Sequence, residues 1–357
     1  MRLNLSKNPT ISEVQSFYRS KQATVLEMTT FFLERAKQID EQICAFDSFN
    51  YQLALQSATK FDQIIQEIGF ETALQEYPLI GIPFATKSIV QGDGLVHNAS
   101  SKILQDFVAP YTCTVLQKVL DAGAILIGVN KMDEFAMGAS GETTQYGITK
   151  NPFDLERVPG GSSSGGAACV GAGQVVFSLG TDTGGSIRQP AAFCGAMGLK
   201  PTYGLVSRFG VIPMSSSLDQ VGAITQNIED NILLTKIMAG EDPKDQTSID
   251  STKLVANLQN LLSNPTAKKY KIGIPKEFYE NLDPIIAQKL EDLKIELTKM
   301  GHTLIPVSLP LSKYSVAVYY TLMAVEVASN LERYDGIRYS KQNSKKLLDD
   351  ILAKLTK

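Results

Sequence analysis

The sequence predicts an α/β protein in which a central β-sheet is covered by helices on both faces. Two observations support this prediction. Amphipathic helical segments alternate along the chain with short apolar runs rich in branched residues, as in proteins whose strands are connected by helices. The chain has 357 residues, of which 43% are hydrophobic and 20% charged, so it is long enough to bury a large core.

The individual elements follow from the spacing of apolar residues. Residues 24–39 predict an amphipathic helix, because apolar side chains recur there at helical spacing: Val25, Met28, Phe32, Leu33, Ala36 and Ile39. A second helix stops at Gly123 and is followed by a buried strand over 124–129. The run "GQVVFSL" predicts another buried strand that leads into the turn "GTDTGG". After a polar stretch at 241–269, expected at the surface, "YKIGIP", "DPIIAQKLEDLKIELTKMG" and "HTLIPVSL" predict strand, helix and strand.

Charge and composition exclude several classes of protein. Lys and Arg total 34 against 37 Asp and Glu, so the net charge of −3 gives no sign of direct nucleic-acid binding. The N-terminus lacks the apolar segment of a signal peptide, and no uncharged run approaches the length of a membrane-spanning helix, so we expect a cytoplasmic protein. The cysteine spacing fits neither a redox pair nor a zinc site, and we expect four reduced, mostly buried thiols and no metal: Cys44, Cys113, Cys169 and Cys194.

Two glycine-rich segments contain the chemistry-bearing serines. Residues 160–166 read "GGSSSGG" and residues 180–186 read "GTDTGGS". Neither segment ends in the Gly-Lys-Ser/Thr of a phosphate-binding loop, and the second lacks the G-x-S-x-G order of a hydrolase nucleophile elbow. Composition alone would make the first segment a flexible linker, but "ERVP" and an apolar segment flank it, which disfavours a spacer. Ser186, preceded by two glycines, has the pattern of an accessible nucleophile.

A serine nucleophile needs a base, and histidine is scarce in this chain. His97 and His302 are the only two, and neither has motif-like neighbours, so both are interpreted as structural. Lys87 ends the apolar run "PLIGIPFATK", a predicted interior strand where a charged ammonium group is costly. Burial would lower the pKa of Lys87 toward a neutral amine. From these residues alone, a buried ion pair and a catalytic base are equally open for Lys87.

Three motifs together resemble the amidase signature family. They are "GIPFATK", "PGGSSSGGAA" and "LGTDTGGSIRQPAAFCGAMGLKPT", and they occur in the family's order and spacing. The resemblance implies the amidase-signature fold, with a mixed central β-sheet covered by helices on both faces. It further implies one domain over 1–357, with a helical segment at about 1–68 and an α/β core at about 69–357.

The resemblance also implies a catalytic triad and an oxyanion hole. Ser186 would be the nucleophile, Ser162 would hold a cis peptide bond and relay the proton, and Lys87 would be the terminal base. The backbone N–H groups of Thr183, Gly184, Gly185 and Ser186 would stabilise the oxyanion. A serine relay that ends in a neutral lysine would therefore replace histidine.

Within this family, "NKMDEFAMG", "VSRFGVIPMSSSLDQVGAIT" and "ERYDGIRY" resemble the amidohydrolase subunits of tRNA-dependent amidotransferases. That resemblance implies hydrolysis of glutamine to glutamate and delivery of ammonia for amidation of misacylated Glu-tRNA(Gln), or Asp-tRNA(Asn), by a partner. The implied partners are subunits B and C of a heterotrimer, with charged tRNA bound through the partner and no membrane involved. No cofactor is expected in this chain, whereas ATP and Mg would be used by the partner subunit.

Three departures from the family pattern keep two alternatives open. Ser88 stands where the family usually has an acidic residue, and Ser164 and Gly166 occupy places usually held by glycine and serine. The sequence ends at Lys357, so the C-terminal part of the family fold, with the groups that recognise the α-amino and α-carboxylate groups of glutamine, is expected to be missing. The alternatives are a stand-alone amidase acting on another amide and a catalytically weak assembly subunit.

Overall fold

The computed structural model describes residues 5–263, 269–336, 338–339 and 352–354. The chain forms two compact units, one made of 1–256 with 326–357 and the other of 257–325. Within the described residues, no helix combines the length and apolar character needed to span a membrane.

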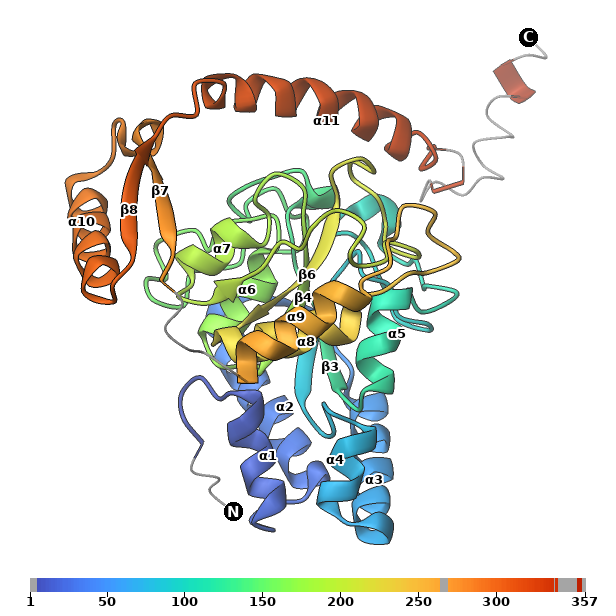
Figure 1. The fold of residues 1–357 in the computed structure, drawn as a ribbon. Coiled ribbons are helices and arrows are strands. Elements are labelled where there is room, and N and C mark those ends of the chain that lie inside the picture. The colour runs from blue at the N-terminus through green and yellow to red at the C-terminus, as the bar shows by residue number, and fades with distance from the viewer. Residues whose placement is uncertain (1–4, 264–268, 337, 340–351, 355–357) are drawn as a thin grey trace. The chain divides into compact units, whose positions relative to one another are not determined.

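The first unit contains the predicted central sheet, which is mixed and six-stranded in the order β1-β3-β2-β4-β6-β5 (Figure 1). β2 runs parallel to β3 and β4, whereas the β1–β3, β4–β6 and β5–β6 pairs are antiparallel. Every residue of β2, β3, β4 and β6 is buried, and because successive side chains point to opposite faces, both faces are covered. The strands are β1 Phe46–Phe49, β2 Pro83–Lys87, β3 Ile125–Asn130, β4 Phe177–Asp182, β5 Met197–Gly198 and β6 Gln220–Thr225.

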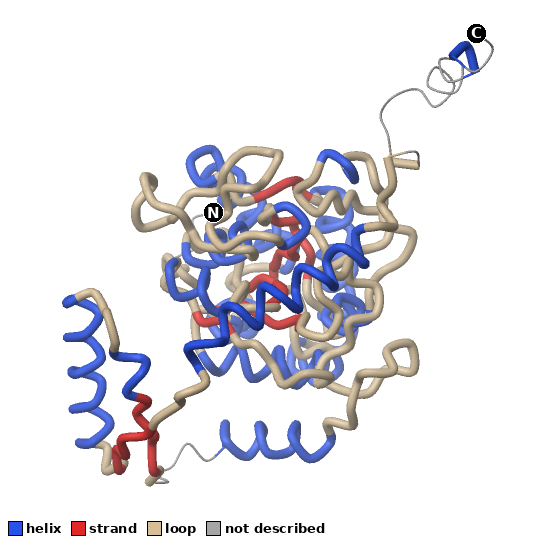
Figure 2. The backbone as a smooth tube through the Cα atoms, turned by 90° about the horizontal axis from the view of Figure 1, so that it is seen from above, coloured by secondary structure: helices blue, strands red, loops and turns tan. Residues whose placement is uncertain are grey.

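Helices surround the strands of this sheet (Figure 2). The predicted amphipathic helix is confirmed as α2, which begins with a capping box between Thr24 and Glu27 and buries the expected apolar face. The helices of the first unit up to residue 256 include α1 Ile11–Arg19, α2 Val25–Ile43, α3 Tyr51–Ile68, α4 Phe70–Glu76, α5 Thr114–Asp121, α6 Ser164–Gly171, α7 Arg188–Phe193 and α8 Ile228–Met238.

Two local expectations were incomplete. The segment at 1–68, expected to be helical, also contains strand β1, which pairs with β3 at the edge of the sheet. Its sequence, "FDSF", is short and half polar, so it lacks a clear strand pattern. The polar stretch at 241–269 contains helix α9, Thr252–Ser263, while residues 264–268 lie outside the described part of the chain.

The second unit has the predicted strand-helix-strand order. Strand β7 (Lys271–Pro275) and strand β8 (Thr303–Val307) are parallel and are connected through helix α10 (Pro284–Lys299). They form a two-stranded sheet of their own and do not extend the central sheet. Helix α11 (Ser315–Leu331) follows them, and its last residues belong to the first unit.

Candidate active site

Lys87 is the last residue of β2, and its side chain is completely buried. Its Nζ atom donates to Ser162 Oγ at 2.7 Å and to Thr181 Oγ1 at 2.9 Å. Burial lowers the pKa of Lys87 to about 7, although the negative charges of Asp133, Asp182 and Asp219 act in the opposite direction. A large fraction of this amine is therefore neutral at pH 7, as a proton acceptor requires.

Ser162 lies in a buried, ordered segment that leads directly into α6. The Gly161–Ser162 peptide bond is cis, and the Ser162 carbonyl accepts the N–H of Asp133 at 3.2 Å. A Cβ atom on Gly161 would come within 2.0 Å of Asp133 Oδ2, so this position has room only for glycine. Every residue of 160–166 is buried, so the flexible-linker interpretation of this segment is wrong.

Ser186 lies in the turn between β4 and α7, and its side chain is 7% exposed. The Ser186 carbonyl accepts the N–H of Ser163 at 3.1 Å, which joins this turn to the segment of Ser162. Among the described residues, Ser186 Oγ has no hydrogen-bond partner, so the structure contains the Lys87–Ser162 step of the expected relay but no hydrogen bond between Ser162 and Ser186. The hydroxyl of Ser186 is thus free to face a substrate.

Asp182 organises the turn that carries Ser186, a role that the motifs alone did not reveal. Its carboxylate accepts the N–H groups of Gly185 at 2.8 Å and Ile187 at 3.2 Å, and it pairs with both Nε and Nη2 of Arg188 at 2.9 Å. Burial raises the pKa of Asp182, but the hydrogen bond and charge of Arg188 outweigh it, so the pKa is lowered. The sequence signal for this role of Asp182 is the pattern "DTGGSIR", in which Asp182 and Arg188 flank the turn.

The hydrogen bond between Gly185 and Asp182 separates the four expected oxyanion donors into one that is already engaged and three that are not. The N–H of Gly185 is engaged by Asp182 Oδ1. In the part of the chain that the structure describes, the N–H groups of Thr183, Gly184 and Ser186 donate to no protein acceptor. These three groups remain available to a developing negative charge on a substrate oxygen.

Gln189 is a second organising residue that the motifs did not single out. Its Oε1 accepts the N–H of Gly161 at 2.9 Å, and its Nε2 donates to the carbonyl of Ala139 at 2.8 Å. One side chain thus connects the start of α7 to the residue before Ser162 and to a third loop.

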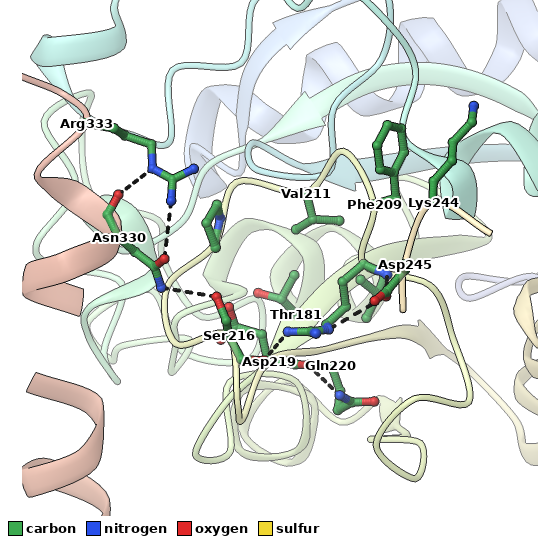
Figure 3. A pocket seen from close by; sticks show the side chains of 13 residues that line it. Thr181, Phe209, Val211, Ser216, Asp219, Gln220, Lys244, Asp245, Asn330 and Arg333 are labelled. Carbon is green, nitrogen blue, oxygen red and sulfur yellow. Dashed lines mark hydrogen bonds and ion pairs between the residues drawn. The ribbon is translucent and has the colours of Figure 1, made fainter. Parts of the chain in front are cut away.

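A pocket of about 300 Å³ borders this site (Figure 3). Thr181, which contacts Lys87, is part of its lining, as is Asp219, whose carboxylate accepts the hydroxyl of Thr183 at 2.7 Å. Figure 3 shows that the pocket wall carries both charge signs, with Lys244 and Arg333 as well as Asp219 and Asp245 in its lining. Arg208 also lines the pocket, and its Nε atom lies 3.9 Å from Asp245 Oδ2. The remaining lining residues are Phe209, Val211, Pro213, Ser216, Gln220, Val221 and Asn330.

Neither histidine takes part in this arrangement. His97 is buried and its Nε2 accepts the N–H of Gly92 at 2.9 Å, while burial lowers its pKa to about 4, so the imidazole is neutral and structural. His302 Nδ1 accepts the N–H of Tyr270. The four cysteines are free thiols, and three are buried, as expected for reduced, mostly buried thiols. Among the described residues, no group of His, Cys, Asp and Glu is arranged to hold a metal ion.

Comparison with known proteins places this chain in a family. The model of the Amidase family matches residues 27–357. The A subunit of the glutamyl-tRNA(Gln) amidotransferase from Coxiella burnetii (strain RSA 493 / Nine Mile phase I) is 46% identical over 344 residues, which cover 96% of this chain and 69% of that protein. The protein of the same name from Geobacillus sp. (strain WCH70) is 44% identical over 342 residues, covering 95% of this chain and 69% of that protein.

Solved structures agree with this placement. The crystal structure of the glutamyl-tRNA(Gln) amidotransferase A subunit from Thermotoga maritima matches with a TM-score of 0.77 at 31% identity and covers 100% of this chain and 72% of that one. The native peptide amidase from Stenotrophomonas maltophilia matches with a TM-score of 0.80 at 29% identity, over 91% of this chain and 67% of that one. The predicted mixed α/β fold is confirmed, and the chain belongs to the amidase signature family.

Proposed function

We propose that this chain is the glutamine-hydrolysing subunit of a glutamyl-tRNA(Gln) amidotransferase and that Ser186, Ser162 and Lys87 are its catalytic triad. The observation that carries the triad is the 2.7 Å hydrogen bond between Lys87 Nζ and Ser162 Oγ in a fully buried site. The pKa of about 7 for Lys87 supports its role as the base. Glutamine as substrate is supported by the names of the relatives that cover most of this chain.

The proposed reaction begins with attack of Ser186 Oγ on the side-chain amide carbon of glutamine. As the new C–O bond forms, the Ser186 proton passes to Ser162 and the Ser162 proton passes to neutral Lys87. Lys87 then returns a proton through Ser162 to the amide nitrogen, the C–N bond breaks, and ammonia leaves. Water attacks the resulting ester through the same relay, which releases glutamate and restores Ser186.

The backbone N–H groups of Thr183, Gly184 and Ser186 are the proposed oxyanion donors. Each such donor contributes on the order of 3 kcal/mol of transition-state stabilisation. Gly185 serves this hole indirectly, because its N–H donates to Asp182 Oδ1 and so fixes the turn in which the other donors lie. Of the four donors expected from the sequence, this assignment keeps Thr183, Gly184 and Ser186 and gives Gly185 a supporting role.

The partners of this chain would be subunits B and C, which would bind the charged tRNA and use ATP and Mg to transfer the ammonia. In this proposal the chain itself holds no cofactor and works in the cytoplasm. A second candidate is a stand-alone amidase on another amide, which the TM-score of 0.80 with the Stenotrophomonas maltophilia peptide amidase favours.

Steady-state kinetics separate the two candidates. Release of ammonia would be measured from glutamine and from small primary amides, with the 357-residue chain alone and with subunits B and C. The proposal predicts glutamine hydrolysis that increases in the presence of the partners. Turnover of other amides with no response to glutamine or to partners would support the stand-alone amidase, and no turnover of any amide would contradict both.

A further inference from the structure

Asp47 is a buried carboxylate that the proposed mechanism does not use. Both of its side-chain oxygens are shielded from solvent, and neither makes a hydrogen bond of normal geometry among the described residues. A buried, unpaired carboxylate is costly, so its retention calls for a specific interaction or role. Burial raises the pKa of Asp47 to about 6, which leaves it mostly ionised at pH 7.

The backbone places Asp47 near the residue that follows β2, because its neighbour Phe46 pairs with Asn130, whose carbonyl accepts the N–H of Ser88 at 3.2 Å. The register between β1 and β3 shifts between Phe46 and Ser48, so Asp47 lies at a β-bulge. A bulge turns a side chain away from the direction that regular alternation would give it, and bulges are frequent beside active sites. Here the bulge lies at the sheet edge where β1 meets the end of β3, the neighbour of β2.

The groups around Asp47 belong to the segments that follow β2 and β3. The charge of Lys131 and the side chains of Ser88 and Asn98 act on the Asp47 carboxylate and partly offset the effect of burial. Ser88 directly follows Lys87, and its hydroxyl donates to Asn98 Oδ1 at 3.1 Å. The negative charge of Asp47 therefore lies beside the residue next to the base.

Lys131 extends this cluster to the segment of Ser162. Its N–H donates to the Ala45 carbonyl at 2.9 Å, and its carbonyl accepts the N–H of Gly165 at 3.1 Å. Its Nζ donates to Cys44 Sγ at 2.6 Å, and it also acts electrostatically on Asp40. Lys131, whose charge acts on Asp47, is thus bonded through its backbone both to the residue before β1 and to helix α6, which follows Ser162.

We infer that Asp47 is a positioning residue for Lys87: its negative charge balances that of Lys131 beside Ser88 and Asn98 and so keeps the segment after β2 in place, and the end of β2 thereby holds the Lys87 amine on Ser162. This inference rests on the proposed role of Lys87 as the base. Asp47 acts here through geometry, because the carboxylates that shift the pKa of Lys87 are Asp133, Asp182 and Asp219. Displacement of a catalytic group by about 1 Å can cost on the order of a hundredfold in rate.

The test measures covalent labelling of Ser186 by an alkyl fluorophosphonate, which needs the activated serine but no recognition of glutamine. Ser186 Oγ bonds to phosphorus, the P–F bond breaks, fluoride leaves, and the hydroxyl proton passes through Ser162 to Lys87. Asp47→Asn keeps the shape of the side chain and removes its charge. We expect its second-order labelling rate to fall at least tenfold, with the midpoint of the pH dependence still near 7.

A matched control is Asp230→Asn, because burial also raises the pKa of Asp230 to about 6, and its carboxylate accepts the N–H of Ile11 at 3.0 Å, away from this cluster. We expect its labelling rate to stay within twofold of the unsubstituted chain. The double variant Asp47→Asn/Lys131→Met removes both charges and should recover at least a third of the lost rate if charge balance positions Lys87. Thermal unfolding of each variant identifies any that is not folded at the assay temperature.

The outcomes separate this inference from the proposed function. Unchanged labelling of folded Asp47→Asn overturns the inference alone, and so does an equal loss in Asp230→Asn. If Asp47→Asn does not fold, the double variant decides: labelling within threefold of the unsubstituted chain supports the inference, and a greater loss overturns it. Absence of Ser186 labelling in the unsubstituted chain overturns the proposed function and this inference with it.

Discussion

The Nζ atom of Lys87 lies 2.7 Å from the Oγ atom of Ser162, and neither side chain is exposed to solvent. A charged ammonium group is unfavourable there, and burial accordingly lowers the pKa of Lys87 to about 7. The same burial that destabilises the ion makes the neutral amine available as a base.

The pH dependence of catalysis follows from this pKa. Protonated Lys87 cannot accept a proton, so kcat/KM for amide hydrolysis should fall about tenfold for each pH unit below 7 and level off above it. Lys87→Arg should be inactive at every pH between 6 and 9, because arginine stays protonated in proteins. A pH–rate profile of both proteins checks this, and an active Lys87→Arg variant would contradict the role of Lys87.

Stability should depend on pH through the same residue. The folded pKa of Lys87 is below its unfolded value of 10.5, so the unfolded state binds more protons between about pH 7 and 10.5 and the folded state gains stability as pH rises through this window. Lys87→Met removes the cost of burying the ammonium group. It should therefore increase the free energy of unfolding more at pH 6 than at pH 10, as measured by urea denaturation, and an equal change at both values would be inconsistent with a lowered pKa.

Replacement of the proposed nucleophile should separate activity from stability. Ser186→Ala should abolish amide hydrolysis, whereas its free energy of unfolding should change by no more than about 0.5 kcal/mol, because the hydroxyl has no hydrogen-bond partner among the described residues. Kinetics and urea denaturation of the same preparation measure both quantities. Residual turnover near the original rate would exclude Ser186 as the nucleophile.

Asp182 should be important for the shape of the turn that carries Ser186. Asp182→Asn replaces one accepting oxygen by an N–H₂ group, which can only donate. The single oxygen that remains cannot accept both the N–H of Gly185 and the N–H groups of Ile187 and Arg188. We expect kcat to fall by at least tenfold and the free energy of unfolding to fall by about 1–3 kcal/mol. A variant with unchanged kcat would show that these hydrogen bonds do not set the position of Ser186.

Gly161 should tolerate no side chain. A Cβ atom there would lie 2.0 Å from Asp133 Oδ2, so Gly161→Ala must displace Asp133 or the Ser162 segment. We expect a loss of at least about 1–3 kcal/mol in the free energy of unfolding together with loss of activity. Gly336→Ala is the matched control, because among the described residues no atom other than those of its chain neighbours lies within 4 Å of a Cβ at that position. Its effect should be within about 0.5 kcal/mol.

Much of the site could be predicted because its signals are local. The apolar run before Lys87 indicated a buried strand end, and the helical spacing after Thr24 indicated α2. The placement of Ser162 and Ser186 relied on motif order, since no local rule brings two glycine-rich turns together. The hydrogen bond from Ser163 to Ser186 that joins them is long-range and leaves no pattern in the sequence.

The features that were not predicted depend on tertiary pairing. Strand β1 is too short and polar to show alternation, and its bulge at Asp47 exists only through its register with β3. The sequence predicts a strand, a helix and a strand for β7, α10 and β8. This order is compatible with strands in the central sheet and with strands in a separate sheet, because sequence order does not fix which strands pair. The hydrogen bond that the Gly185 N–H donates to Asp182 Oδ1 depends on where the Asp182 side chain lies in the folded turn.

Trapping the covalent intermediate would show whether Ser186 is the residue that attacks glutamine. The chain with subunits B and C would be mixed with glutamine, quenched in acid during turnover and digested, and its peptides analysed by mass spectrometry. We predict a glutamyl ester on Ser186 that is absent from Ser186→Ala and from Lys87→Met. Hydrolysis of glutamine with no ester on Ser186, or with the ester on another residue, would contradict the proposed mechanism.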